Sequence, residues 1–369
     1  MARISFKTTL VAAFSAVLIF FGSSAFAKEE GEGGHGEGAK EEFNAGEAIL
    51  HHIADSHEWH FFSLGDKHIS LPLPVIVYSP ERGLSIFSSS HFHHGEEVYN
   101  GYKLEHDKVI GVKEDGSTDE SVNVYDFSMT KNVVQMILAV ITLIWVMTAI
   151  GKKYTQEGAG KAPSGFQNAI EPVITFVRDD VARPNLGHKY KKYLPYLLTV
   201  FFFILINNLF GLLPGAANVT GNIAFTALLA LVSFIVIMFS TNSHFWGHIF
   251  WPPNVPLPVK IILIPVELMG VFIKPVALMI RLFANMTAGH IVILSFVSLI
   301  FIFGQMSTIA GWGFSPVSIA FSVFIYLIEI LVAFIQAFIF TTLTAVFIGQ
   351  AFEGEHHAEG AGHHEALSH

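Results

Sequence analysis

Five long apolar blocks constrain the fold of this chain more than any other feature of its sequence. They occupy residues 133–150, 194–213, 223–239, 259–304 and 317–351 of a 369-residue chain. The first three are each close to the roughly 20 residues that one upright helix needs to cross a membrane. Only 14% of all residues are charged, against roughly 25% in soluble domains. The pattern predicts an all-α polytopic membrane protein with about five membrane-crossing helical segments.

The last two blocks are too long to be upright helices. At about 1.5 Å per residue, a helix over 259–304 would measure about 70 Å, while the hydrocarbon core of a bilayer is about 30 Å thick. Gly270, Pro275 and Gly289 are positions at which such a helix can bend. We predict that the two segments are long and tilted, and that they pair as a hairpin.

The first 27 residues predict a signal peptide for export. Arg3 and Lys7 precede an apolar stretch at 10–21, and Ala25 and Ala27 match the small-x-small pattern of a cleavage site. The alternative is an uncleaved membrane anchor, but the apolar stretch is short for a span of roughly 20 residues.

Residues 28–128 form a hydrophilic, acidic and histidine-rich region in front of the apolar blocks. We predict a small β-containing exported domain, with strands at 68–78 and 84–90, two more within 102–112, and an amphipathic helix at 51–62. The membrane domain then covers 129–352, and the tail at 353–369 is predicted to be disordered.

The distribution of basic residues predicts the orientation in the membrane. The loop between the first and second blocks carries an excess of positive charge, which is typical of cytoplasmic loops. The hydrophilic domain is then periplasmic, as the signal peptide independently requires, and five crossings leave the C-terminus in the cytoplasm. The basic residues of this loop are Lys152, Lys153, Lys161, Arg178, Arg183, Lys189, Lys191 and Lys192.

Several functions are excluded by what the sequence lacks. There is no cysteine, which excludes disulfides, thiolate metal sites and cysteine nucleophiles. There is no phosphate-binding GxxxxGK[ST] loop, and no basic patch stands clear of the membrane-flanking lysines, so no nucleic-acid partner is expected. Histidine clusters at 91–94 and 356–364 lack a diagnostic ligand spacing, and we interpret them as solvated polar tracts. We predict no catalytic residue, no metal and no cofactor.

Ionisable side chains inside apolar blocks are costly and usually functional. In this chain they are confined to the last two blocks, and the second block adds only a pair of asparagines. The intramembrane polar residues are Glu267, Lys274, Arg281, Asn285 and His290 in the fourth block, Tyr326, Glu329 and Gln336 in the fifth, and Asn207 and Asn208 in the second.

Helical spacing groups these residues on faces. Seven residues return a helix to nearly the same face, so Glu267, Lys274 and Arg281 share a stripe, and Asn285 lies one turn beyond it. His290 faces the opposite way. In the fifth block, Tyr326, Glu329 and Gln336 share one face by the same rule, as their positions show.

Depth in the membrane suggests a proton path. Arg281 lies near the middle of its block, Glu267 lies toward the cytoplasm, and His290 and Glu329 are predicted at similar depth on the outer side. Arginine does not deprotonate, so Arg281 can block a proton leak and attract a carboxylate on a partner, whereas histidine and glutamate can relay protons. Lys274 either pairs with Glu267 or extends to the interface. Buried ion pairs can also simply hold helices together, but the matched faces and depths favour two offset half-channels.

The segment PVELMGVFIKPVALMIRLFANMTAGHIVIL, at 265–294, resembles the signature of the subunit a family of F-type ATP synthases, with RLFANMTAGH as its core. Residues 328–351 are similar to the last helix of that family, and 207–226 to its middle hairpin. The long histidine-rich outer domain departs from the usual short N-terminus and resembles that of subunits from Bacteroidetes-type bacteria.

The resemblance implies roles for individual residues. Arg281 would be the essential arginine that faces the carboxylates of the rotating c-ring, with Asn285 and Gln336 as its polar neighbours. Many bacterial members carry glutamate at the position of His290 and histidine at that of Glu329, and here the two are exchanged, as in mitochondrial forms. The implied partners are the c-ring, the b subunit of the peripheral stalk, the other ATP synthase subunits and the bilayer of the inner membrane, with protons as the default coupling ion.

Two other functions remain as alternatives. An autonomous ion-coupled secondary transporter often shows internal repeats with paired broken helices, and no repeat is visible in this sequence. A membrane-anchored metal-handling protein built on the histidine clusters would leave the intramembrane charges without a role.

Overall fold

A computed structural model of the chain describes residues 44–64, 67–95, 97–105, 107–113, 117–119, 121–157, 165–213, 215–241, 243–251 and 256–352. Contacts within it define two compact units. The first comprises residues 1–138, 210–219 and 289–328, and the second comprises 139–209, 220–288 and 329–369. The predicted signal peptide and the predicted disordered tail lie outside the described residues.

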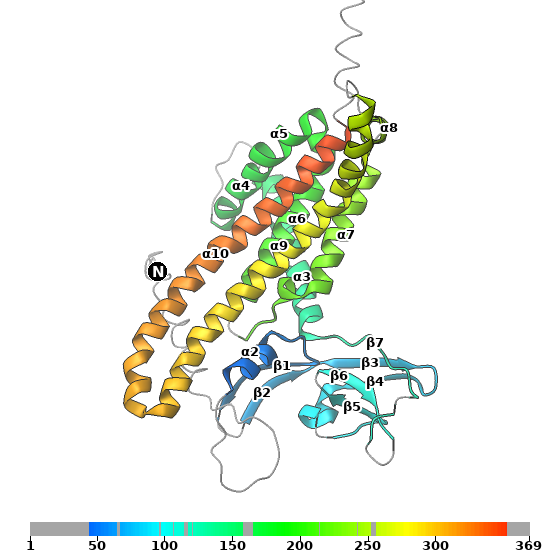
Figure 1. Cartoon of the computed structure of the whole chain (residues 1–369). Coiled ribbons are helices and arrows are strands. Elements are labelled where there is room, and N and C mark those ends of the chain that lie inside the picture. The colour runs from blue at the N-terminus through cyan, green and yellow to red at the C-terminus, as the bar shows by residue number, and fades with distance from the viewer. Residues whose placement is uncertain are drawn as a thin grey trace, which may run out of the picture. The chain divides into compact units, whose positions relative to one another are not determined.

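The N-terminal part of the first unit contains small antiparallel sheets, drawn in blue and cyan in Figure 1. Strands β1 and β2 pair, β3 lies between β4 and β7, and β5 pairs with β6. Helix α2 precedes the strands, and a 3₁₀ segment, η1, follows β4. The elements are α2 (Ala45–Ile53), β1 (Glu58–Leu64), β2 (Lys67–Pro72), β3 (Pro74–Ser79), β4 (Gly83–Ser88), η1 (Ser89–Gly95), β5 (Tyr102–Glu105), β6 (Lys108–Gly111) and β7 (Tyr125–Asp126).

A small apolar core holds these strands together. Alternate residues of β3, Val75 and Val77, are fully buried, as the period of two in a strand requires. They form one cluster with Phe92, Tyr102 and Val109. The prediction of a small β-containing domain is therefore confirmed. We refer to residues 44–127, as far as they are described, as the outer domain.

Two local predictions in the outer domain are wrong. The strand expected at 68–78 is two strands, which separate at Leu73 and pair with different partners. Pro72 and Pro74 flank this position, and proline has no backbone N–H to give to a strand ladder. The helix expected at 51–62 ends at Ile53, and Glu58–Leu64 is strand β1, whose aromatic residues favour a strand.

The described residues from 131 onward are mainly helical. Among the described residues, four helical stretches are long and apolar enough to cross a membrane, namely Lys131–Gln156, Phe166–Gly211, Leu257–Met306 and Thr308–Gln350, and Ile223–Phe239 is a shorter apolar helix. The predicted all-α polytopic fold is therefore confirmed. The elements are α3 (Lys131–Glu157), α4 (Phe166–Phe176), the π-helical η2 (Val177–Ala182), α5 (Arg183–Leu186), η3 (Gly187–Lys189), α6 (Tyr190–Gly211), η4 (Val219–Gly221), α7 (Ile223–Phe239), α8 (Ser243–Phe250), α9 (Leu257–Met306) and α10 (Thr308–Phe352).

Helices α9 and α10 form a long antiparallel hairpin, which runs from yellow to red in Figure 1. Only Ser307 separates the two helices. Near this turn their backbones are close, because a Cβ on Gly311 would lie 2.8 Å from the Cα of Gly304. Helix α9 is continuous although it contains Pro265 and Pro275. The tilt of the hairpin in a membrane remains a prediction.

The second unit has its own apolar core, which positions α9 and α10. Leu278 and Leu282 of α9 and Phe340 of α10 are buried together with Phe201 of α6. At its C-terminal end α10 packs backbone to backbone, because a side chain on Gly349 would collide with the carbonyl oxygen of Asn185. One face of each long helix is therefore fixed against the bundle, which determines which residues the other faces present.

Candidate functional site

Arg281 lies on the exposed surface of α9. Its neighbours along the helix include large apolar side chains that are also exposed, such as Ile280 and Val276. Among the described residues, no carboxylate lies within ion-pair distance of the Arg281 guanidinium. A permanent cation on an apolar surface inside a membrane segment is costly without a partner. A negatively charged group against this face of α9 would lower that cost, and the described residues do not supply one.

Asn285, one turn after Arg281, connects the two long helices. Its Nδ2 donates a hydrogen bond to Oε1 of Gln336 at 2.8 Å. Gln336 is only 1% exposed, and its Nε2 has no hydrogen-bond partner among the described atoms. The structure thus brings together the two polar neighbours of Arg281 that the sequence predicted. An unsatisfied buried amide group commonly marks a position where water binds.

Glu329 is buried on α10, with 5% of its surface exposed. Neither of its carboxylate oxygens has a hydrogen-bond partner among the described atoms. A buried carboxyl group without a fixed partner suits the transfer of a proton better than the holding of two helices together. The geometry therefore speaks against the purely structural reading of this glutamate.

The asparagine pair of α6 is buried in the same unit. Both Asn207 and Asn208 are 0% exposed. Nδ2 of Asn208 donates to the carbonyl oxygen of Ala333 on α10 at 3.3 Å, one helical turn after Glu329. The side-chain oxygens of both asparagines lack a partner among the described atoms. These orphaned oxygens, the carboxyl group of Glu329 and the amide of Gln336 are buried polar groups of the second unit that lack a hydrogen-bond partner among the described atoms.

Three other predicted residues take less central positions. Nζ of Lys274 donates to Oε1 of Gln350 at 3.3 Å and lies 4.7 Å from the centre of the Phe347 ring. Lys274 thus bonds to α10, and no ion pair with Glu267 is found among the described residues. Glu267 is exposed on α9, and Tyr326 is half-buried on α10.

His290 belongs to the first unit. Its Nε2 lies 2.9 Å from the carbonyl oxygen of Gly211, the last residue of α6. Because a carbonyl oxygen only accepts, Nε2 carries the hydrogen of this bond. Glu329 belongs to the second unit, and the pairing of His290 with Glu329 remains a prediction.

The hydrogen bond between Asn285 and Gln336 makes a testable contribution. Asn285→Ala should leave the buried Oε1 of Gln336 without its donor, at a cost of roughly 1–3 kcal/mol. The double variant Asn285→Ala/Gln336→Ala should lose less than the sum of the single effects. Thermal midpoints and proton-pumping rates of the detergent-purified complex would measure both. Additive losses would contradict the bond, and Thr341→Val, at another buried polar position of α10, is the matched control.

Some polar residues of the structure were missed from the sequence. Ser322 is buried seven residues before Glu329, on the same face of α10, and its hydroxyl has no partner among the described atoms. Gln135 is buried near the start of α3, where it binds the backbone of Ala217. A lone amide in an apolar block was the available signal for Gln135, whereas a serine gives almost none.

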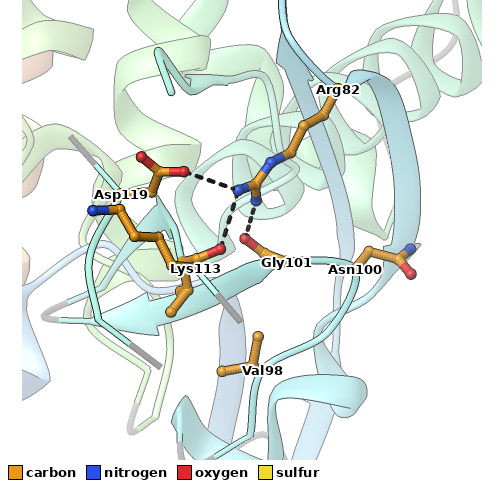
Figure 2. Close-up of a pocket in the computed structure, with 7 residues that line it drawn as sticks. Arg82, Val98, Asn100, Gly101, Lys113 and Asp119 are labelled. Atoms are coloured by element: carbon orange, nitrogen blue, oxygen red, sulfur yellow. Dashed lines mark hydrogen bonds and ion pairs between the residues drawn. The ribbon is translucent and has the colours of Figure 1, made fainter. Parts of the chain in front are cut away.

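The outer domain contains a cavity of about 630 Å³ beside Arg82 (Figure 2). The Arg82 guanidinium donates hydrogen bonds to the carbonyl oxygens of Gly101 and Val112 and to the carboxylate of Asp119, the last at 3.3 Å. Gly101 has a φ of 77°, and a side chain there would meet Arg82. Arg82 therefore braces the turn after β3 against the loops around β5 and β6. None of the predicted site residues lines this cavity.

The described histidines of the outer domain have ordinary partners. His91 stacks on Tyr99 with ring centres 4.2 Å apart, and His93 lies 3.7 Å from Glu97. Within the described ranges, no group of three or more histidine, aspartate or glutamate residues has metal-binding geometry. The histidines at 356–364 lie outside the described residues.

Known families match both parts of this chain. A family model described as ATP synthase A chain matches residues 133–349, which include every predicted site residue. The chain belongs to the ATP synthase A chain family. A second family model, a domain of unknown function (DUF8433), matches residues 48–127. The resemblance that residues 265–294 carry is thus confirmed, and as a family member the chain is a multi-pass inner-membrane component of ATP synthase.

Individual relatives extend the similarity beyond the membrane helices. The chain is 47% identical over 250 residues to ATP synthase subunit a of Chloroherpeton thalassium, covering 66% of this chain and 72% of the relative. It is 40% identical over 344 residues to ATP synthase subunit a of Chlorobium phaeobacteroides, covering 90% of this chain and 82% of the relative. An alignment over 90% of the chain necessarily reaches into the outer domain.

Proposed function

We propose that this chain is the proton-translocating stator subunit of the ATP synthase membrane sector. Two offset half-channels lead protons to and from the carboxylates of the c-ring, and proton flow through them drives rotation and ATP synthesis. The chain itself performs no catalysis. Family membership favours this function over an autonomous secondary transporter.

The exposure of Arg281 carries the proposal. The residue lies near the middle of the 50-residue helix α9, and its cation has no acidic partner among the described residues. A carboxylate on a moving partner would supply the missing charge at each step of rotation. Since arginine keeps its proton, the same side chain prevents a proton from passing directly between the half-channels.

The surface beside Arg281 also suits a partner helix. Ala277, Ala284 and Ala288 are all exposed on adjoining turns of α9. Small residues let two membrane helices approach closely, which favours packing in a bilayer. A c-subunit helix that packs on these alanines would bring its carboxylate within reach of the guanidinium.

The half-channels use the polar residues on either side of Arg281. We assign proton entry from the periplasm to His290 and Glu329, supported by the buried and unsatisfied carboxyl group of Glu329. We assign the cytoplasmic half-channel to Glu267, exposed on α9. With His290 and Glu329 on the periplasmic side and Glu267 on the cytoplasmic side, the outer domain is periplasmic and the C-terminus is cytoplasmic. The b subunit and the other ATP synthase subunits complete the assembly.

Cysteine cross-linking tests the proposed contact with the c-ring. The chain has no native cysteine, so Ala284→Cys introduces a unique thiol on the alanine face of α9. With a second cysteine on the outward helix of the c subunit, oxidation in membranes should give a disulfide, because the Cα atoms need to be only about 4.4–6.8 Å apart. Gel mobility of the subunits measures the product.

A matched control uses an exposed residue of another helix. Ile141→Cys on α3 is also exposed and should not cross-link to the c subunit. Efficient cross-linking at Ile141 with none at Ala284 would show that α3, and not the Arg281 face of α9, contacts the ring.

A further inference from the structure

The loop between α6 and α7 is held from three directions. We call residues 211–217, apart from Pro214, the α6–α7 loop. Its carbonyl oxygens accept hydrogen bonds from Trp59 of the outer domain, from Gln135 of α3 and from His290 of α9. All these residues belong to the first unit. The loop therefore connects the outer domain directly to a residue of the proposed proton path.

The bond from the outer domain is specific. Nε1 of Trp59, on strand β1, donates to the carbonyl oxygen of Gly215 at 2.7 Å. Trp59 is 8% exposed, so the indole is packed in place and its N–H has a fixed direction. Gly215 has a φ of 75°, a conformation that favours glycine. The direction of the Trp59 N–H and the backbone conformation of the loop at Gly215 are therefore both fixed.

The clamp from α3 is bidentate. Nε2 of Gln135 donates to the carbonyl oxygen of Ala217 at 2.6 Å, and the backbone N–H of Ala217 donates to Oε1 of Gln135 at 2.8 Å. Gln135 is 1% exposed and Ala217 is fully buried. One amide side chain therefore holds both backbone groups of Ala217, without competition from bulk water.

The strand segment that carries Trp59 is itself anchored to α3. Asp55 accepts hydrogen bonds from the hydroxyl of Thr130 at 3.0 Å and from the backbone N–H of Asn132 at 3.2 Å. The second of these bonds caps the first turn of α3.

A second contact holds the same segment to strand β7, because His57 lies 2.7 Å from the carboxylate of Asp126. Burial alone would raise the pKa of Asp126, but hydrogen bonds from His57 and Ser128 outweigh it and bring the pKa below its ordinary value. Asp126 thus remains ionised at neutral pH.

The loop transmits this anchoring to His290. Gly211 packs against the peptide that Gln135 clamps, because a Cβ on Gly211 would lie 3.5 Å from the carbonyl oxygen of Ala217. The carbonyl of Gly211 in turn accepts the Nε2 hydrogen of His290. Such a bond sets which ring nitrogen is protonated and how the ring is oriented.

We propose that the outer domain is a positioning element for proton entry. Trp59 and Gln135 hold the α6–α7 loop so that the carbonyl of Gly211 keeps its hydrogen bond with Nε2 of His290 and fixes the orientation of the imidazole ring that takes up the incoming proton. This assigns a role to the domain of unknown function that residues 48–127 match. The inference rests on the proposed function, because it requires His290 to relay protons.

The first test removes one donor. Trp59→Phe keeps an aromatic ring but loses the N–H, and should slow ATP-driven proton pumping in inverted vesicles about two- to tenfold, the range expected for one hydrogen bond. Gln135→Leu should slow it more, because it removes two bonds. Trp145→Phe, on the exposed surface of α3, is the matched control and should leave the rate unchanged. A Trp59→Phe rate equal to that of Trp145→Phe would overturn the proposal.

The second test asks whether Trp59 acts through His290. In a His290→Ala background, Trp59→Phe should produce no further loss, because the group that it positions is gone. An equal loss in both backgrounds would mean that the outer domain supports the complex independently of His290, and would overturn the inference. Unimpaired pumping by His290→Ala alone would instead contradict the proposed function.

A spectroscopic measurement separates positioning from folding. In ¹⁵N-histidine-labelled complex, the difference between native and His290→Ala solid-state NMR spectra isolates the ring of His290. We expect the signal of a protonated, hydrogen-bonded Nε2 in the native complex, and a shift of this signal in Trp59→Phe, in which the bond to Gly211 is loosened. An unchanged His290 signal in Trp59→Phe would overturn the inference even if the variant pumped slowly.

Discussion

Replacement of Arg281 with alanine should abolish ATP-driven proton pumping in inverted membrane vesicles while the complex still assembles. Removing one partner of a charge pair in a low-dielectric site costs roughly 3–5 kcal/mol, which corresponds to about a 100- to 4,000-fold loss of rate at 1.4 kcal/mol per factor of ten. The c-ring carboxylate would lose its counter-charge at the stator, and the barrier between the half-channels would lose its permanent cation. Quenching of a pH-sensitive dye measures pumping.

A passive leak distinguishes the two roles of Arg281. With a potential imposed and no ATP, vesicles carrying Arg281→Ala should lose their proton gradient faster than native vesicles, since about 2.3 kcal/mol per charge per 100 mV drives the leak. Ile280→Ala, at the adjacent exposed position of α9, controls for altered packing and should pump normally. Normal pumping by Arg281→Ala in an assembled complex would show that the arginine is structural and that the proposed path is wrong.

Removal of either relay group should have an effect of similar size, and exchange of the two should restore part of the rate. Glu329→Gln and His290→Ala each remove a proton-carrying group, and general acid–base groups typically contribute about 10²–10⁴-fold, so each variant should slow proton entry severely. His290→Glu combined with Glu329→His restores one acid and one imidazole. We therefore expect the double exchange to pump faster than His290→Glu or Glu329→His alone. Rates of ATP synthesis after an acid–base jump measure proton entry.

The double exchange tests cooperation and not merely the presence of polar groups. If the double variant is no faster than its two single components, the two residues do not share a proton and the facing-pair geometry is incorrect. Thr341→Val changes a buried side chain of α10 whose hydroxyl bonds only within its own helix, to Ala337. It should leave synthesis close to the native rate.

The helices of this chain are largely predictable because their boundaries are chemical. The third apolar block and α7 share the same bounds, Ile223–Phe239. Asn222 caps the start of this helix by accepting a hydrogen bond from the backbone N–H of Ala224 at 2.9 Å. The apolar run and the helix therefore start at the same residue. Helix α10 begins at Thr308, before its apolar block, because helix–helix packing sustains the extra turns.

The site was predictable only in part. An arginine in an apolar block is conspicuous in any sequence, and helical spacing puts Asn285 one turn beyond it. Whether Glu329 has a hydrogen-bond partner depends on how α6 packs on α10, which no local pattern encodes. The bond from Trp59 to Gly215 joins residues separated by 156 positions, and neither residue carries a local signal of its partner.

The single residue between α9 and α10 has a mechanical consequence. If a ring turns against α9, as we propose, it pushes sideways on the middle of that helix, and the stator has to resist this torque. The one-residue turn prevents α9 from sliding along α10 by a helical step, and the close backbones at Gly304 and Gly311 leave no slack at the tip. The tip of the hairpin is therefore held by the main chain, and this packing persists while the side chains along the two helices gain and lose protons.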